Sequence, residues 1–151
     1  MHSRIFQVSK DADFEKASEV DYYDFSVADF VGDVDDADAV EDIMWLSETL
    51  GEAVSFNEDY TVMTIVNKRA YFEALYTNFK KSLDALALET SKDSFCDGLL
   101  GSSVYRLTEA YDDEYGFYIN ECSYPVTLTS FMRGVTDGDV YYMGTVTDYH
   151  F

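Results

Sequence analysis

The spacing of apolar residues predicts a long amphipathic helix over residues 68–89. Its apolar side chains recur every three or four positions, as on one face of a helix, and Asn67 stands directly before it as a capping residue. The stripe consists of Phe72, Leu75, Tyr76, Phe79, Leu83 and Leu86.

A second helix is predicted over residues 39–50, after an acidic loop at residues 32–38. The positions of its inner stripe are Val40, Ile43, Met44, Ser47 and Leu50. Asp38 is the expected cap, Glu41 three positions later completes a capping box, and Gly51 ends the helix. The opposite, exposed face then carries Glu41, Asp42, Glu48 and, just past the end, Glu52.

Alternating apolar and polar residues predict strands elsewhere. Residues 3–9 form the first expected strand, and residues 53–56 and 60–66 form a hairpin. Residues 22–30 fit either a helical stripe or an alternation, and we favour a strand because aromatic and β-branched residues dominate there.

The C-terminal part of the chain predicts a β-meander over residues 102–149, in which Asp137-Gly138 favours a type I′ hairpin turn. Its strands are expected at residues 104–110, 115–122, 126–135 and 139–149. The chain is therefore expected to be a single α+β domain, residues 1–151, with two principal helices packed on an antiparallel sheet of five to seven strands.

The net charge is strongly negative and unevenly distributed. The chain has 30 acidic and 10 basic residues, a net charge of −20, several times the magnitude of roughly 2 to 8 that suits a small domain. Residues 1–60 hold 17 acidic and 3 basic residues, whereas residues 61–151 hold 13 and 7. This argues against direct binding of nucleic acid, which needs clustered Lys and Arg. The acidic segment 10–60 indicates a surface for a basic partner instead.

The sequence lacks the parts of a familiar active site. His2 and His150 are its two histidines, and each lies one residue from an end of the sequence, so a Ser-His-Asp or Cys-His arrangement is not expected. Neither the dinucleotide-binding nor the phosphate-loop glycine motif occurs. With thirty carboxylates, any particular acidic pair says little about glycosidase chemistry. We predict no enzymatic activity and no cofactor.

The acidic loop resembles the start of a calcium-binding loop, but only its start. Counted from Asp33, such a loop needs an oxygen ligand, Gly and Glu at its fifth, sixth and twelfth positions, which here are Ala37, Asp38 and Met44. A solvated loop is favoured over a weak calcium or magnesium site, and zinc is disfavoured because Cys and His do not cluster.

The cysteines and the lengths of the apolar runs indicate in which cellular compartment the protein is expected. Cys96 and Cys122 are expected to be small buried hydrophobes in a reducing environment. No apolar run of the length of a signal peptide or a membrane span occurs, so we expect a cytoplasmic protein without a membrane partner.

The acidic segment has the spacing needed to imitate a nucleic-acid backbone. Carboxylates three or four positions apart on a helix lie roughly 5 to 6 Å from each other, near the spacing of phosphates along a strand. Interleaved Tyr22, Tyr23 and Phe25 either stack in a groove meant for bases or are buried. The residues predicted to contact a basic partner are Asp21, Asp24, Asp29, Asp33, Asp35, Asp36, Asp38, Glu41, Asp42, Glu48 and Glu52.

Residues 21–30, Asp-Tyr-Tyr-Asp-Phe-Ser-Val-Ala-Asp-Phe, together with the helix at 39–50, resemble the acidic strand-then-helix units of ArdA-type anti-restriction proteins, which are DNA mimics encoded on mobile elements. The resemblance covers about thirty residues and consists of aromatic-acidic alternation followed by a short acidic helix. It implies an inhibitor that blocks a restriction or CRISPR effector by occupying its DNA site. The alternative is a non-catalytic interaction domain with a solvated acidic surface, which meets a protein partner through a hydrophobic patch.

Overall fold

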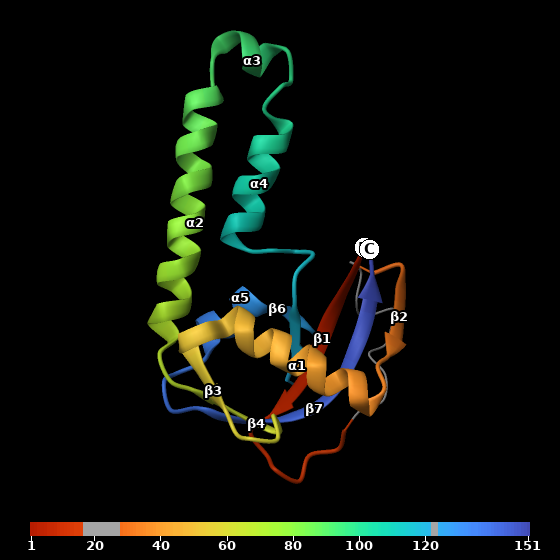
Figure 1. The fold of residues 1–151 in the computed structure, drawn as a ribbon. Coiled ribbons are helices and arrows are strands. Elements are labelled where there is room, and N and C mark those ends of the chain that lie inside the picture. The colour runs from red at the N-terminus through yellow and green to blue at the C-terminus, as the bar shows by residue number, and fades with distance from the viewer. Residues whose placement is uncertain (17–27, 122–123) are drawn as a thin grey trace.

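The computed structural model describes residues 1–16, 28–121 and 124–151. In these residues a mixed sheet of seven strands carries a helix across one face, and a helical hairpin projects away from the sheet (Figure 1). The strands are β1 (His2–Ser9), β2 (Phe30–Asp33), β3 (Val54–Phe56), β4 (Val62–Ile65), β5 (Tyr118–Asn120), β6 (Val126–Thr127) and β7 (Val140–His150). The helices are α1 (Asp36–Leu50), η2 (Gly51–Ala53), α2 (Lys68–Glu89), α3 (Lys92–Cys96), α4 (Gly101–Tyr111) and α5 (Leu128–Gly134). The α+β class and the expected number of strands are confirmed.

Strand β7 lies at the centre of the sheet. The strand order is β3-β4-β7-β1-β5-β6, and β2 also pairs with β7. One side of β7 is covered by β1 along most of its length, while β4 and β2 share the other side. The β1–β5 pair is parallel, so the prediction of a wholly antiparallel sheet is wrong at this pair.

The hydrogen-bond ladder between β1 and β7 is irregular at one point, where the side chain of Gln7 accepts hydrogen bonds from β7. The register between β1 and β7 shifts between Phe6 and Val8. The amide oxygen of Gln7 accepts hydrogen bonds from the backbone nitrogen and the hydroxyl of Thr145, each at 3.2 Å. A side chain at the neighbouring Gly144 would overlap that Gln7 amide. Glycine at this position therefore lets the side chain of β1 satisfy the backbone of β7 where the ladder is interrupted.

The two faces of the sheet bury separate clusters, because successive strand residues point to opposite sides. Phe6 faces the larger core, which includes Leu46 of α1 and Met132 of α5. Ile5 faces the opposite way and packs in a smaller cluster with Tyr118, Tyr149 and Ala28.

The predicted β-meander is wrong in two of its four segments. Residues 104–110 belong to helix α4, where the buried Ser103 and Ala110 recur at helical spacing against α2. Residues 128–134 form helix α5, and its N-cap Thr127 accepts a hydrogen bond from the backbone nitrogen of Ser130 at 3.2 Å. The Asp137-Gly138 turn is not type I′, since Gly138 has a φ of +94° whereas Asp137 does not have a positive φ.

Helix α2 has the predicted bounds and the predicted Asn67 cap, yet only its start packs against the core of the sheet, through the partly buried Tyr71 and Phe72. No residue of α2 is buried, and its main neighbour is α4. We call residues 68–111 the arm and the remainder of the chain the body. At the base of the arm the Tyr71 hydroxyl is hydrogen-bonded to the hydroxyl of Thr129 at 2.8 Å. Cys96 lies exposed at the far end of the arm, which corrects the expectation that it is buried, and Cys122 lies outside the described residues.

Candidate partner-binding surface

Most of the predicted contact residues lie exposed along β2, α1 and η2. Figure 1 shows β2 running down one edge of the sheet and α1 crossing its face directly afterwards, so the segment that carries these residues follows one bent path. The exposed members are Asp29, Asp33, Asp35, Asp36, Asp38, Glu41, Glu48 and Glu52. We call this set the acidic row. Asp21 and Asp24 lie outside the described residues, as does most of the strand predicted at 22–30.

The start of α1 places the first members of the row. The Asp35 carboxylate accepts hydrogen bonds from the backbone nitrogens of Ala37 and Asp38, at 3.1 and 3.0 Å, and so caps the helix. The predicted cap at Asp38 is therefore wrong by one turn. The sequence offers several acids in succession, and Asp35 is the one with extended backbone directly before the helix.

The outer face of α1 combines carboxylates with apolar side chains. Glu41 and Glu48 are both exposed and stand two helical turns apart, about 10 Å along the axis. Val40 and Met44 lie 42% and 41% exposed, which corrects the predicted inner stripe. Ile43 and Leu50 lie on the inner face as predicted, and Asp42 and Leu46 complete it.

Asp42 is the acid of α1 that the structure removes from the predicted contact set. It is 8% exposed, and its carboxylate accepts a hydrogen bond from the Arg4 guanidinium at 2.5 Å. The same guanidinium also donates to Asp148 of β7. The sequence-based prediction placed Asp42 on the outer face because an acid is normally solvated. Its partner Arg4 lies 38 positions away in the chain, so the spacing within the helix gives no sign of the pair.

The acidic row receives little compensation from the chain itself. No Lys or Arg occurs between Lys16 and Lys68, a stretch that contains fourteen acids. Asp29 is bonded to His150 at 2.7 Å. Among the described residues no ion pair reaches Asp33, Asp36, Asp38, Glu41, Glu48 or Glu52. Neighbouring like charges destabilise a fold, so the row is better suited to an external cation than to the free protein.

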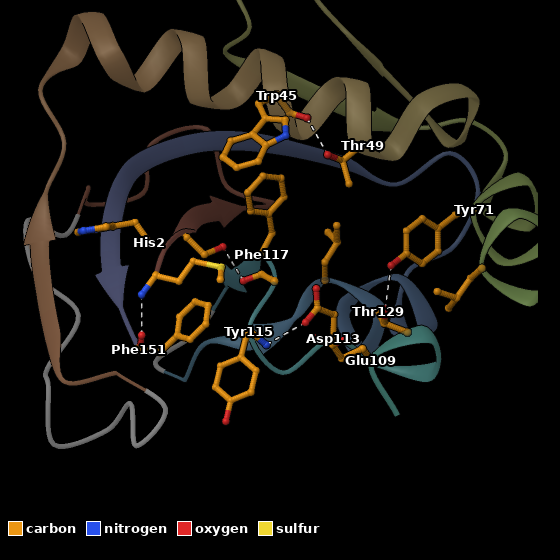
Figure 2. Close-up of a pocket in the computed structure, with 15 residues that line it drawn as sticks. His2, Trp45, Thr49, Tyr71, Glu109, Asp113, Tyr115, Phe117, Thr129 and Phe151 are labelled. Atoms are coloured by element: carbon orange, nitrogen blue, oxygen red, sulfur yellow. Dashed lines mark hydrogen bonds between the residues drawn. The ribbon is translucent and has the colours of Figure 1, made fainter. Parts of the chain in front are cut away.

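A cavity of about 370 Å³ lies beside α1, between the arm and the sheet. Figure 2 shows Trp45 of α1 next to Phe117, with Tyr71 of α2 on the other side of the space. Trp45 and Phe117 meet edge to face, with ring centroids 4.6 Å apart. The cavity could not be predicted from the sequence, because its walls come from segments that are distant in the chain.

Two carboxylates, from Glu109 and Asp113, line the floor of this cavity. Partial burial raises the pKa of Asp113, so its ionised form would gain from a nearby cation. Glu109 accepts a hydrogen bond from Tyr105, which raises the pKa of that phenol to about 12. Among the described residues, no Lys or Arg lines the cavity, and the Met1 ammonium at its rim donates to the Phe151 carbonyl at 2.7 Å. Aromatic faces beside carboxylates suit a cationic group such as a Lys or Arg side chain.

The remaining sites considered in the sequence have other surroundings. His2 is bonded to Asp148 at 2.8 Å, and its ring lies 4.8 Å from that of His150 on the neighbouring strand. In the described ranges, no group of three or more His, Cys, Asp or Glu side chains is placed to hold a metal ion. None of the helices described is both long enough and apolar enough to span a membrane.

Comparisons with known protein families, with curated proteins and with solved structures found no match. The resemblance to ArdA-type proteins therefore stays a prediction, and functional inference depends on the surface itself.

Proposed function

We propose that this protein is an acidic inhibitor that occupies the nucleic-acid-binding site of a basic protein, such as a restriction or CRISPR effector. The observation that carries the proposal is the acidic row, because it is exposed and lies in a stretch of chain without Lys or Arg. A surface of this kind attracts a cationic groove and repels nucleic acid.

The density of charge along the row supports imitation of one nucleic-acid strand. Six of its carboxylates, from Asp35 to Glu52, are spread along α1 and η2, over about 25 Å at a helical rise of 1.5 Å per residue. The mean interval between neighbouring carboxylates is about 5 Å, of the same order as the 3.4 Å per charge along a single strand of B-DNA. The exposed Val40 and Met44 between the acids would add apolar contact to the partner.

The cavity beside α1 gives a basic partner a place to anchor. A Lys or Arg side chain entering between Trp45 and Tyr71 would meet aromatic faces and the Asp113 carboxylate together. Cation–π contacts and charge-assisted hydrogen bonds are strongest in such partly desolvated surroundings.

A second candidate function is that of a non-catalytic interaction domain with a solvated acidic surface. The observation that favours it is the exposed apolar side chains of the arm, among them Tyr76, Leu88 and Phe95. In that case binding to a partner would depend on the arm, and the acidic row would serve solubility.

The test is a titration of the protein against a purified restriction endonuclease, an RNA-guided nuclease and a DNA methyltransferase, with DNA binding and turnover as readouts. We expect near-stoichiometric inhibition of a susceptible enzyme, relief by excess duplex DNA and weakening with rising salt. Inhibition that salt and DNA leave unchanged would exclude the acidic row as its cause.

Matched charge reversals locate the contact. Glu41→Lys with Glu48→Lys should raise the inhibitory concentration at least about tenfold, which corresponds to 1.4 kcal/mol. The control, Glu58→Lys with Asp59→Lys at the β3–β4 turn, makes the same change in net charge on exposed acids outside the row. Equal effects of the two pairs would assign the inhibition to net charge and not to the row.

A further inference from the structure

The arm has an apolar face formed jointly by α2 and α4. Tyr76 and Leu83 of α2 are 65% and 39% exposed, and Val104 and Tyr111 of α4 are 48% and 57% exposed. Within each pair the residues stand seven positions apart, so they share one side of their helix. Tyr76 and Tyr111 also line the same groove of about 380 Å³, which Arg133 of α5 lines as well with its guanidinium 4.7 Å from the centre of the Tyr111 ring. Together with the helical spacing, this shared groove places both pairs on one face of the arm.

The arm carries none of the net charge of the protein. Residues 68–111 hold six basic and six acidic residues, so the formal charge of −20 resides entirely in the body. The arm of one molecule can therefore approach the arm of another without the repulsion that two bodies would experience.

Charge is also divided along the arm. Its body-proximal part, residues 68–84 and 104–111, which includes 17 of the 22 residues of α2, holds five basic and three acidic residues, a charge of +2. Its tip, residues 85–103, holds one basic and three acidic residues, a charge of −2. Such an arm is complementary to a second arm that lies beside it in the opposite direction.

We propose that a second copy of this chain covers the apolar face of the arm, with the two arms antiparallel. A twofold axis across the arms then brings each negative tip against the positive, body-proximal part of its partner, as a self-complementary interface requires. The proposal concerns the arm and is independent of the function assigned to the acidic row.

The antiparallel arrangement also keeps the two bodies apart. Helix α2 has 22 residues and is about 33 Å long. Bodies at opposite ends of the paired arms are separated by several Debye lengths, which are about 8 Å each at physiological ionic strength. Parallel arms would instead place two bodies of charge −20 side by side.

The first test is the molar mass of the whole chain, measured by light scattering and sedimentation from micromolar to near-millimolar concentration. We expect a concentration-dependent rise to twice the monomer mass of 17.2 kDa. A chain that remains monomeric at every concentration overturns the proposal.

Paired variants then locate the interface. Leu83→Glu with Val104→Glu places charges on the apolar face and should raise the dimer dissociation constant at least about tenfold, or 1.4 kcal/mol. The control, Phe30→Glu with Val126→Glu, adds the same charge at exposed apolar residues of the body, which are 56% and 41% exposed. Helix content measured by circular dichroism verifies that the arm of each variant is folded. Dissociation by the control and not by the arm variant would overturn the assignment to this face.

The exposed Cys96 reports the direction of the arms without altering the apolar face. In a Cys122→Ser background, antiparallel arms keep the two Cys96 thiols at opposite ends of the pair, so oxidation should leave the dimer without a disulfide between chains. A spin label on Cys96 should likewise give a long distance between the two copies. Rapid formation of a Cys96–Cys96 disulfide within the dimer would show parallel arms and contradict the proposed complementarity.

Discussion

The guanidinium of Arg4 on β1 donates to the carboxylate of Asp42 on α1 at 2.5 Å, and both side chains are largely buried, with 23% and 12% exposed. This pair ties the helix that carries the acidic row to the strand beside the centre of the sheet. Basic residues are few in this protein. Arg4 is one of them, and its guanidinium positions α1 and does not neutralise the exposed carboxylates of the acidic row.

Removal of the Asp42 carboxylate should destabilise the fold. Asp42→Ala leaves the partly buried Arg4 with Asp148 as its one remaining carboxylate partner among the described residues and should lower the free energy of unfolding by roughly 1 to 3 kcal/mol. The matched Glu41→Ala variant removes an exposed carboxylate from the same helix and should change it by less than about 0.5 kcal/mol. Urea unfolding followed by circular dichroism measures both, and equal effects would show that the pair has no structural role.

Asp35, and not Asp38, should determine the stability of the start of α1. Asp35→Ala removes the side chain that accepts from two backbone nitrogens and should cost about 1 kcal/mol. Asp38→Ala should cost only a few tenths of a kcal/mol, because it loses a favourable charge near the helix N-terminus and no cap. Asp35→Asn retains the cap while removing the charge, so it separates stability from partner binding. A larger loss for Asp38→Ala than for Asp35→Ala in thermal unfolding would contradict this assignment.

Gly144 should not tolerate a side chain. Gly144→Ala places a methyl group where the Gln7 amide lies and displaces its hydrogen bonds to Thr145, at an expected cost of about 1 to 3 kcal/mol. Gly134→Ala at the end of α5 meets no atom within 4 Å and lies at a negative φ, so it should be neutral or slightly stabilising. Chemical denaturation of the two variants compares them directly.

The protein should lose stability at alkaline pH through its buried tyrosines. Burial raises the pKa of Tyr149 to about 12, and its hydroxyl donates to the Gly116 carbonyl at 2.5 Å. Burial also raises the pKa of Tyr118. Because the folded state holds these protons more tightly than the unfolded chain, whose tyrosine pKa is about 10, stability is retained below that pH and falls as pH rises towards the folded values.

The tyrosine contribution is measured by urea unfolding at a series of pH values from about 9 upwards. Tyr149→Phe should reduce the slope of stability against pH, even though it loses the hydrogen bond to Gly116 and starts less stable. A slope in Tyr149→Phe as steep as that of the parent would show that this phenol does not drive the alkaline loss.

The sequence predicts a helix well where its capping residue and its apolar stripe indicate the same start and the same buried face. Helix α2 was predicted to the residue because Asn67 and its apolar spacing indicate the same start and face. Helix α4 was predicted as a strand, because alternating Val104, Arg106 and Thr108 conceal the helical spacing of Ser103, Leu107 and Ala110. That spacing becomes decisive only when α2 lies alongside, and the sequence does not show this neighbour.

The amino-acid composition predicted one part of the candidate surface, namely its exposed acids. The exposed acids of β2 and α1 follow from the charge of the segment, whereas the inward direction of Asp42 depends on Arg4, a partner from a distant strand. The cavity and the projection of the arm depend on how segments that are remote in sequence meet. The parallel pairing of β1 with β5 could not be predicted either, because the local alternation of apolar and polar residues carries no information about strand direction.

The central position of β7 has a consequence for biosynthesis. Three strands of the sheet, β1, β2 and β4, hydrogen-bond to β7, and all three leave the ribosome before it does. The arm has local contacts and can fold while the chain is growing, whereas the pairs that β1, β2 and β4 form with β7 must wait for residues 140–150. During that interval the edge of β1 that later pairs with β7 is open to non-native pairing, and the strongly negative charge of the first half of the chain opposes such association.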